Sequence, residues 1–542
     1  MDSFNVTIQS LDNEGRGIST LPSGKKVFIP GTLPGEECLI ELQKESSRYA
    51  EALCVKLLTQ SEHRIQPFGE NIPGCNLAHL SYAEQLKYKK EKVLNCLTRI
   101  GRFEQNSISM LLNDTVASEE TANYRNHMQY KIASGKVSLT LEGSNTAVPA
   151  DNSPLEYPVF SLVRRVVDSI FYDSPSNLFS GLVLRGSLRT REITMELVSD
   201  LEDSHERIIS ATSAYLTSTC MADKISEAIG EYKLMGITLR MSRSAAEKRT
   251  RGGKRVVITG EDYYTEKLCG RTFRIKAGAF FQVNIPQAEK LYTLAGKEIS
   301  YAKSVCDIYC GTGSIGLSVI SEGQQLLGVE SVAEAVASAK INATLSGVSN
   351  AKFICRPAEK FNFSDERLPS PIAAIVDPPR QGLDLGFINH LLKLNPDTIS
   401  YVSCDPATMA RDLMHIVNSG KYAITSVTPV DMFPQTSHVE TVVQLSKGSV
   451  PSQDVKVKFS MENVSSAKYV DKPATYEQIK TYVKEHSGLN VSSLYIAQVK
   501  QKYGIIERDC YNLPKSDDSR QPKCPESKEK AIVDALTYYK MI

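Results

Sequence analysis

Residues 304–320, SVCDIYCGTGSIGLSVI, decide the fold of this chain. The stretch opens with an apolar run typical of a buried strand and closes with the spacing of an amphipathic helix. Between them stand Gly311, Gly313 and Gly316, a G-x-G-x-x-G turn that lets the backbone approach a ligand closely. The stretch therefore predicts the first strand–helix turn of a doubly wound, Rossmann-like α/β sheet.

A repeat of strand, turn and helix extends on both sides of this stretch, over residues 275 to 447. It predicts a parallel sheet with right-handed crossovers. Glu330, Asp377 and Cys404 each stand at the carboxyl end of a predicted strand, and open α/β sheets bind ligands at that edge. Ordinary strand-ending turns do not explain three such side chains on one edge, so we interpret the edge as an active site.

Glu330 and Asp377 indicate what this edge binds. Glu330 ends the strand QLLGVE, where a carboxylate typically accepts hydrogen bonds from ribose hydroxyls. NAD and S-adenosylmethionine both carry such a ribose, so the glycine turn leaves both cofactors open. Asp377 is followed by Pro378 and Pro379, which stiffen the turn and hold the carboxylate over the crevice.

Cys404 ends the strand TISYVSC and precedes the predicted helix DPATMARDLMHIV. Asp405 suits the N-cap of that helix, and Pro406 suits its first position. The helix N-terminus favours a thiolate at Cys404, whereas the charge of Asp405 opposes it, so the direction of the pKa shift stays open. A thiolate at this edge reads as a nucleophile.

Glu440 lies in the strand-like run HVETVVQL. A carboxylate in such a run is costly unless it is exposed, paired or functional. A charge on the solvent face of a strand and a catalytic base are both consistent with this stretch. A thiolate, a carboxylate base and a methyl donor together suit methylation of a pyrimidine at C5, in which the sulfur adds to C6 and a base removes the C5 proton.

Five motifs in fixed order carry a resemblance to a known family: GAFFQVN, DIYCGTGSIGL, VDPPRQGL, VSCDPATMARDL and FPQTSHVETV. They resemble the RNA uracil-C5 methyltransferases, especially the 23S ribosomal RNA branch. The N-terminal stretches GRGI and IPGTLPGE are similar to the TRAM domain that many members carry. The similarity covers roughly residues 1 to 447.

The resemblance implies an enzyme that uses S-adenosylmethionine, with RNA, most simply 23S ribosomal RNA, as its partner. Cys404 would be the nucleophile and Glu440 the base that abstracts the C5 proton. The positions that match the family's cofactor contacts, with the two glycines of the turn, are Gln282, Tyr309, Gly311, Gly313, Glu330 and Asp377.

The same resemblance, with the pattern of strands and turns, predicts five regions. They are a TRAM-like, OB-like β-barrel at 1–58, a connecting helical segment with a degenerate cluster motif at 59–119, a mostly β central RNA-binding domain at 120–272, the methyltransferase domain at 273–447, and a small helical module at 451–542. The last resembles a helix-turn-helix, with Gln498, Lys500, Gln501 and Lys502 on its second helix, and both RNA binding and a scaffolding role stay open for it.

One departure from the family concerns iron. Many members hold an iron–sulfur cluster through C-x5-C-G-G-C-x2-Q-H and a later cysteine. Here Cys75 and His79 remain, but Gln66 and Ile72 occupy the first two ligand positions and Tyr157 the later one. One thiol cannot hold a cluster that needs four ligands, so we expect no iron–sulfur centre and no metal.

Composition sets the remaining bounds. The net charge is +1 and no two of the twelve cysteines form a C-x-x-C pair, which argues against a zinc module or a general polyanion binder. No apolar run approaches the roughly 18 residues of a membrane helix and no targeting peptide is evident, so we expect a cytoplasmic protein without an obligate protein partner. Residues 240–255 carry seven basic side chains against Glu247, consistent with a solvated turn or with contact to RNA phosphates.

Two other functions remain as alternatives. A tRNA uracil-C5 methyltransferase would show the same catalytic motifs, because they do not distinguish the RNA. A NAD-dependent oxidoreductase is permitted by the glycine turn, but it leaves Cys404, Glu440 and the prolines after Asp377 without a role.

Overall fold

The computed structural model describes residues 3–67, 73–141, 146–150, 153–242, 247, 252–448, 476–503 and 524–539. The chain forms two compact units, Met1–Lys458 and Phe459–Ile542, and each is described by itself. Among the sequence-predicted positions, Ile72 and residues 243–246 and 248–251 of the basic segment lie outside the described residues. Within the described part, no helix has both the length and the apolar character needed to cross a membrane.

The N-terminal part is a six-stranded, half-closed sheet, as the alternation of apolar residues and turns predicts. Its strands lie in the order β1-β5-β6-β4-β3-β2, and one face buries a core that includes Val27, Ile29 and Ile40. The strands are β1 (Ser3–Thr7), β2 (Ser10–Leu11), β3 (Gly17–Thr20), β4 (Lys26–Ile29), β5 (Glu37–Glu45) and β6 (Tyr49–Leu57).

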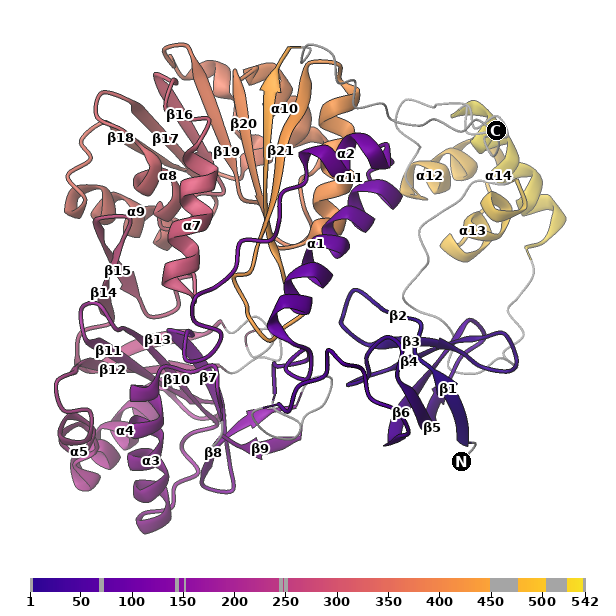
Figure 1. The fold of residues 1–542 in the computed structure, drawn as a ribbon. Helices are drawn as coiled ribbons and strands as arrows, with labels where there is room; N and C mark the ends of the chain where they lie inside the picture. The colour runs from indigo at the N-terminus through magenta and orange to yellow at the C-terminus, as the bar shows by residue number, and fades with distance from the viewer. Residues whose placement is uncertain are drawn as a thin grey trace. The chain divides into compact units, whose positions relative to one another are not determined.

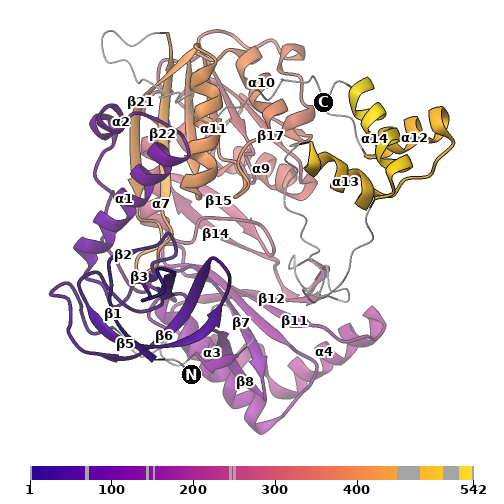
Figure 2. The same ribbon diagram turned by 90° about the vertical axis from the view of Figure 1, so that its right-hand side faces the viewer.

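Two helices follow, α1 (Tyr82–Arg99) and α2 (Gln105–Leu111). Ser81 is the N-cap of α1, although its side chain makes no capping hydrogen bond. Val93 and Leu97 on α1 are fully buried in the core of the methyltransferase sheet, and both views show α1 lying beside β21 (Figures 1 and 2). Helix α1 is therefore part of the catalytic domain's packing rather than a free linker.

The central part is a seven-stranded sheet in the order β13-β12-β11-β10-β7-β8-β9. Three helices, α3 (Pro158–Asp173), α4 (His205–Thr219) and α5 (Met221–Ala228), cover one face of it (Figure 1). The strands are β7 (His127–Ala133), β8 (Lys136–Thr140), β9 (Ala147–Pro149), β10 (Gly181–Ser187), β11 (Glu192–Ser199), β12 (Lys233–Met241) and β13 (Lys254–Gly260). A hairpin, β14 (Tyr263–Leu268) and β15 (Arg271–Lys276), leads from this sheet to the next.

The methyltransferase domain confirms the predicted Rossmann-like sheet. Its strand order is β18-β17-β16-β19-β20-β22-β21, parallel except for the pairs that involve β22. The strands are β16 (Ser304–Ile308), β17 (Gln325–Glu330), β18 (Ala351–Cys355), β19 (Ile372–Val376), β20 (Thr398–Ser403), β21 (Tyr422–Val430) and β22 (Glu440–Lys447).

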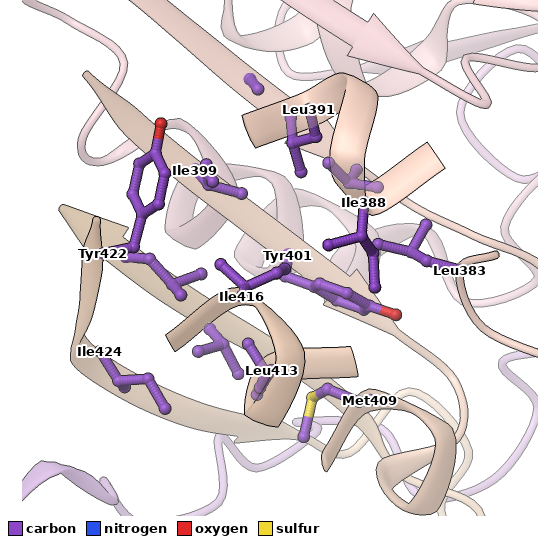
Figure 3. Close-up of a cluster of buried hydrophobic side chains, with 14 of the residues drawn as sticks. Leu383, Ile388, Leu391, Ile399, Tyr401, Met409, Leu413, Ile416, Tyr422 and Ile424 are labelled. Carbon is purple, nitrogen blue, oxygen red and sulfur yellow. The ribbon is translucent and has the colours of Figure 1, made fainter. Parts of the chain in front are cut away.

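Helices cover both faces of this sheet. One face packs against α7 (Ile285–Gly296), α8 (Ser314–Val319) and α9 (Ala333–Leu345). The other packs against α10 (Leu385–Leu394) and α11 (Pro406–Asn418), where Tyr401 of β20 lies among Ile388, Leu413 and Ile416 (Figure 3). The Tyr401 hydroxyl donates to Asp412 Oδ2 at 2.7 Å, which satisfies a buried polar group in that core.

The second unit contains α12 (Tyr476–Ser487) and α13 (Ser493–Lys502), the two helices that the sequence predicts. It also contains α14 (Glu526–Tyr538), which the sequence analysis did not predict. All three contribute to one small core that includes Ile479, Ile496 and Leu536.

The polar side chains of α13 are used within this unit. Lys500 is only 4% exposed, Lys502 forms an ion pair with Glu529 of α14, and Gln498 accepts a hydrogen bond from the backbone of Cys524 at 3.0 Å. RNA binding and a scaffolding role both stay predictions for this module.

Candidate active site

Five residues singled out by the sequence come to one edge of the methyltransferase sheet. Tyr309 follows β16, Glu330 ends β17, Asp377 follows β19 and Cys404 follows β20. Glu440 reaches the same edge for a different reason: β22 runs antiparallel to β20 with Thr441 opposite Ser403, so its first residue lies where β20 ends. The topology thus brings Cys404 and Glu440 together although 35 residues separate them in sequence.

Three residues in and next to the glycine turn have a positive φ. Gly311 and Gly313 have φ of 55° and 79°, which favour glycine, and Tyr309 has a φ of 64° despite its side chain. A Cβ added at Gly311 would have no heavy atom within 4 Å, so that side of the turn is open. By contrast, a Cβ at Gly316 would lie 2.6 Å from Asp307 Oδ2, because the turn packs tightly on its inner side.

Two carboxylates hold this turn. Glu330 Oε2 accepts the Gly311 N–H at 3.1 Å, and its Oε1 accepts from Ser331 and Val332. Asp307, fully buried in β16, accepts the Gly316 N–H at 2.9 Å, and burial raises the pKa of this carboxyl to about 7. The turn is therefore rigidly positioned, with the Glu330 carboxylate at its open side.

Tyr309 and Gln282 have different surroundings. The Tyr309 hydroxyl donates to Glu359 Oε1 at 2.8 Å, and its ring packs against Phe387 with centroids 5.6 Å apart. Gln282 is 6% exposed and comes from the segment GAFFQVN between β15 and α7, where the neighbouring Phe280 is 75% exposed. An exposed aromatic ring beside the site was not among the residues that the sequence analysis chose, although the FFQ motif contains it.

Cys404, Asp377 and Glu440 form an electrostatically coupled group. Burial, followed by the charges of Glu440 and Asp377, raises the pKa of the Cys404 thiol to about 12. Burial and the charge of Asp377 raise the pKa of Glu440 to about 8, although Arg380 opposes the shift. Burial and Asp307 raise the pKa of Asp377 to about 7. At neutral pH the thiol is therefore protonated, and the pKa values of the two carboxyls lie close to neutral pH.

The helix after Cys404 does little to acidify the thiol. Asp405 is the N-cap of α11, as expected, and its Oδ1 accepts the N–H groups of Ala407 at 2.8 Å and Thr408 at 3.2 Å. Since Asp405 already satisfies those groups, the helix end offers little stabilisation to a thiolate at Cys404. The pKa of the thiol is raised mainly by burial, then by the charges of Glu440 and Asp377, and Asp405 makes only a smaller contribution in the same direction.

The connection between β21 and β22, residues 431–439, carries Glu440 into place and is held by contacts that the sequence analysis missed. The Gln85 side chain accepts the N–H of Gln435 at 3.0 Å and donates to its side-chain oxygen at 3.0 Å. The N–H of Leu77 donates to the Gln435 carbonyl at 3.0 Å, and the Tyr124 hydroxyl donates to the Pro434 carbonyl at 3.0 Å. No local pattern could reveal these pairs, because about 350 residues separate Gln85 from Gln435.

Two further side chains join this connection to the N-terminal sheet. Asn76 accepts the Ser437 N–H at 2.9 Å and donates to the Glu14 carbonyl at 2.8 Å. Lys92 of α1 donates to the carbonyls of Asn13 at 2.8 Å and Ser437 at 2.9 Å. One turn of the N-terminal sheet and the approach to Glu440 are therefore held by the same two side chains.

Comparisons with known proteins identify the family. The model of the tRNA (Uracil-5-)-methyltransferase family matches residues 245–448, and the TRAM domain model matches residues 2–55. An RNA methyltransferase of Caldanaerobacter subterraneus subsp. tengcongensis, itself uncharacterised, is 33% identical over 473 residues, which cover 82% of this chain and 98% of that one. The chain belongs to the RNA uracil-C5 methyltransferase family.

Two more likenesses agree with this assignment. An uncharacterised RNA methyltransferase of Staphylococcus aureus is 32% identical over 453 residues, 80% of this methyltransferase and 96% of its relative. The solved structure of the Pyrococcus abyssi tRNA (uracil-54, C5)-methyltransferase in complex with S-adenosyl-L-homocysteine has a TM-score of 0.64 and 24% identity, and covers 81% of this chain and 99% of that one. The second likeness confirms the fold of an S-adenosylmethionine-dependent methyltransferase with an N-terminal TRAM domain.

The sheet edge suits S-adenosylmethionine. The backbone on the open side of Gly311 can be approached closely, and the adjacent Glu330 carboxylate can accept hydrogen bonds from ribose hydroxyls. The N–H of Asp377 donates to the Ile308 carbonyl at 3.3 Å, which joins the end of β19 to the end of β16. The open backbone and the adjacent carboxylate fit a nucleoside with a ribose.

The degenerate cluster motif of this methyltransferase lies in an apolar pocket. Cys75 is buried with Ala78, Tyr124 and Leu155, and burial raises the pKa of its thiol to about 12. Burial lowers the pKa of His79 to about 4. The surroundings suit a neutral thiol and a neutral imidazole, and the expected lack of an iron–sulfur centre stays a prediction.

Proposed function

We propose that this methyltransferase transfers the methyl group of S-adenosylmethionine to C5 of a uridine in 23S ribosomal RNA, through a covalent adduct between Cys404 and C6 of the base. The observation that carries the proposal is the meeting of Cys404 and Glu440 at one sheet edge, beside the glycine turn. The resemblance of the motifs to the 23S branch and the TRAM domain support ribosomal RNA as the substrate.

The positions proposed to hold the cofactor surround the turn. Glu330 would accept the ribose hydroxyls, and Tyr309 and Asp377 would border the turn from β16 and β19. The remaining contacts would come from Gln282, Gly311 and Gly313. Bound S-adenosylmethionine supplies an electrophilic methyl group on a sulfonium.

Cys404 and Glu440 divide the proton chemistry. The Cys404 thiol, with its pKa near 12, must give up its Sγ proton as sulfur bonds to C6, and the neighbouring carboxylates whose charges it senses are the acceptors at hand. Glu440 must be unprotonated when the C5 proton leaves, and its pKa near 8 makes it a stronger base than an ordinary carboxylate. When Glu440 takes that proton, the C5–H electron pair forms the C5=C6 double bond, the C6–S bond breaks, and Cys404 leaves the base as a thiolate.

A uridine in folded RNA must leave its stack to reach Cys404. Phe280, exposed beside Gln282, is placed to receive an unstacked base on its ring. Arg380, which follows the two prolines and acts on the charges of both Cys404 and Glu440, adds a positive charge at the same mouth.

The covalent step is tested with Cys404→Ala. Since the sulfur acts on the base while the cofactor turn lies elsewhere on the edge, methylation should fall by at least about 10⁴-fold, with affinity for S-adenosylmethionine within about twofold of the parent. Methyl transfer to RNA and calorimetric cofactor binding measure the two quantities. Substantial turnover by the variant would remove Cys404 from the mechanism.

A tRNA substrate is the second candidate, because the matching family model is described as a tRNA methyltransferase and the P. abyssi enzyme is named for uracil 54 of tRNA. Mapping 5-methyluridine in 23S and transfer RNA from cells that lack the gene separates the two. Loss at one or two 23S positions supports ribosomal RNA, and loss in transfer RNA overturns that choice.

A further inference from the structure

Three carboxyl groups stand at the glycine turn on neighbouring strands of the methyltransferase sheet. Asp307 lies in β16, Asp377 directly follows β19 on one side of that strand, and Glu330 ends β17 on the other. The charge of Glu330 acts on Asp307, and the charge of Asp307 acts on Asp377, so neighbouring groups lie within electrostatic reach. The three form a row, named here the carboxyl row.

Two members of the carboxyl row lack a positive partner. Asp307 is fully buried; its Oδ2 accepts the Gly316 N–H at 2.9 Å, while its Oδ1 has no hydrogen-bond partner among the described residues. The Asp377 carboxyl takes part in no hydrogen bond or ion pair within the part of the chain that the structure describes. No cationic side chain in that part acts on the pKa of either group.

Like charges in such a place are costly, and there are two ways to remove the cost. One is to hold a proton: burial, with Glu330 acting on Asp307 and Asp307 acting on Asp377, raises both pKa values to about 7. The other is a cationic ligand beside the carboxylates. Asp377 keeps part of its surface exposed, so that protons and a ligand can both reach it.

The chemistry of methyl transfer brings a cation to this end of the row. The charge of Asp377 acts on the pKa of both Cys404 and Glu440, so its carboxyl is near the residues proposed to act on the uridine. In that reaction C5 is one bond from C6, which is joined to Sγ of Cys404, and C5 takes its methyl group from a sulfonium. The positive sulfur must therefore come close to Asp377, and it becomes a neutral thioether once the methyl group has left.

We propose that Asp377, with Asp307 behind it, distinguishes S-adenosylmethionine from its product S-adenosylhomocysteine by charge: the carboxyl gives a proton to solvent when the sulfonium binds and takes one back after methyl transfer. The inference rests on the proposed function for the position of the sulfonium. An ionised Asp377 attracts the positive sulfur. Beside the neutral product the same carboxyl regains its proton, the attraction is lost, and release of the product is favoured.

The test is titration calorimetry of the full chain with each cofactor, without RNA, in two buffers that differ in their enthalpy of ionisation. Because the pKa of Asp377 is about 7, this carboxyl should release about half a proton when S-adenosylmethionine binds at pH 7. The affinity for S-adenosylmethionine should rise from pH 6 to pH 8. S-adenosylhomocysteine should release no proton, and its affinity should not rise over that range.

Asp377→Asn isolates the carboxyl from the amino group of the cofactor, which also titrates. The variant should lose the proton release that Asp377 supplies and bind S-adenosylmethionine about tenfold more weakly, with the affinity for S-adenosylhomocysteine within about twofold of the parent. Asp397→Asn is the matched control and should behave as the parent. Asp397 precedes β20 at the opposite end of the sheet, and its side chain is 49% exposed.

Asp307→Asn distinguishes charge from structure. Asparagine keeps an acceptor for the Gly316 N–H but removes the charge that raises the pKa of Asp377, so the pH midpoint for binding S-adenosylmethionine should move to lower pH. Equal proton release by the parent and Asp377→Asn overturns the proposal, as does an unmoved midpoint in an Asp307→Asn protein that melts at the parent temperature. Since RNA is absent, a protein that binds as expected but methylates no uridine would refute the proposed reaction and leave the charge discrimination standing.

Discussion

Asp431 and Glu440 stand at the two ends of one connection and have opposite surroundings. Asp431 is fully buried; its Oδ1 accepts from Lys89, and its Oδ2 accepts from the Tyr82 hydroxyl at 2.8 Å. Glu440 is 5% exposed, and besides burial only the charges of Asp377 and Arg380 act on its pKa. A carboxylate matched by a cation and a hydroxyl holds the fold together. A buried carboxylate with a like charge beside it is available for chemistry.

The two carboxylates also differ in how much their burial destabilises the fold. Lys89 gives its charge to Asp431 and a second hydrogen bond, 3.0 Å long, to the Phe433 carbonyl, so the ion pair also secures the connection. At Glu440 the charge of Arg380 opposes burial and Asp377 without cancelling them, and the raised pKa records the free energy needed to charge this carboxyl in place. The ion pair at Asp431 therefore holds one end of the connection, while the other end leads to Glu440, whose charged form is unfavourable in the fold.

The largest expected effect is that of Glu440→Gln on the rate of turnover. Loss of the base should lower the release of methylated RNA by about 10²- to 10⁴-fold, because the C5 proton cannot leave. A covalent protein–RNA adduct should accumulate and be visible on a denaturing gel. Rapid methylation with no adduct would place the base on another residue.

The next effect is on stability, in Lys89→Met. Removing the cation leaves Asp431 buried and uncompensated, which should cost about 3–5 kcal/mol of unfolding free energy. Chemical denaturation measures the loss. The double variant Lys89→Met/Asp431→Asn is the control and should recover much of it, whereas an equally unstable double variant would mean that the ion pair is not the cause.

A smaller effect is expected in the pH dependence of stability. The folded pKa of Glu440, about 8, lies above its ordinary value of 4.5, so the unfolded chain loses this proton first as the pH rises. Stability contributed by the protonated group is present below about pH 4.5 and is lost through about pH 8. Glu440→Gln should therefore be more stable than the parent at pH 8, by on the order of a few kcal/mol of unfolding free energy, with the gain shrinking toward pH 5. Chemical denaturation across that range measures it, and a constant difference would contradict the assignment.

The smallest effect is expected from Lys92→Met. It breaks the hydrogen bonds to Asn13 and Ser437, which should cost about 1–2 kcal/mol and lower kcat up to about tenfold with KM nearly unchanged. Lys90→Met is the control, since Lys90 lies on the same helix and pairs with the exposed Asp114. Lys92→Arg should restore much of kcat, and an equal loss in the Lys90 variant would exclude a positioning role.

The sequence predicted the parts of the site that depend on local order. Glu330, Asp377 and Cys404 follow apolar strands, so the alternation of strand and helix was enough to place them on one edge. It also predicted the N-cap Asp405, because capping is local. The direction of the Cys404 pKa shift could not be predicted, since it depends on Glu440 and Asp377, which only the sheet order brings near.

What the sequence analysis missed depends on distant pairs. Asn76, Gln85 and Lys92 look like ordinary polar residues of a loop and a helix, and their partners lie about 350 positions away. Helix α14 was not predicted either, although Ile532, Ala535 and Leu536 show helical spacing.

The position of β22 has a consequence for how the protein is made. It is the last strand of its sheet along the chain, yet it lies between β20 and β21, which do not pair with each other. On the ribosome, a nascent chain that has reached only residue 439 has Cys404 at an unfinished sheet edge, without the carboxylate that we propose releases the RNA. Insertion of β22 closes the sheet and delivers Glu440 in a single step. Interrupted synthesis therefore yields no partial enzyme that could capture RNA, methylate it and let it go.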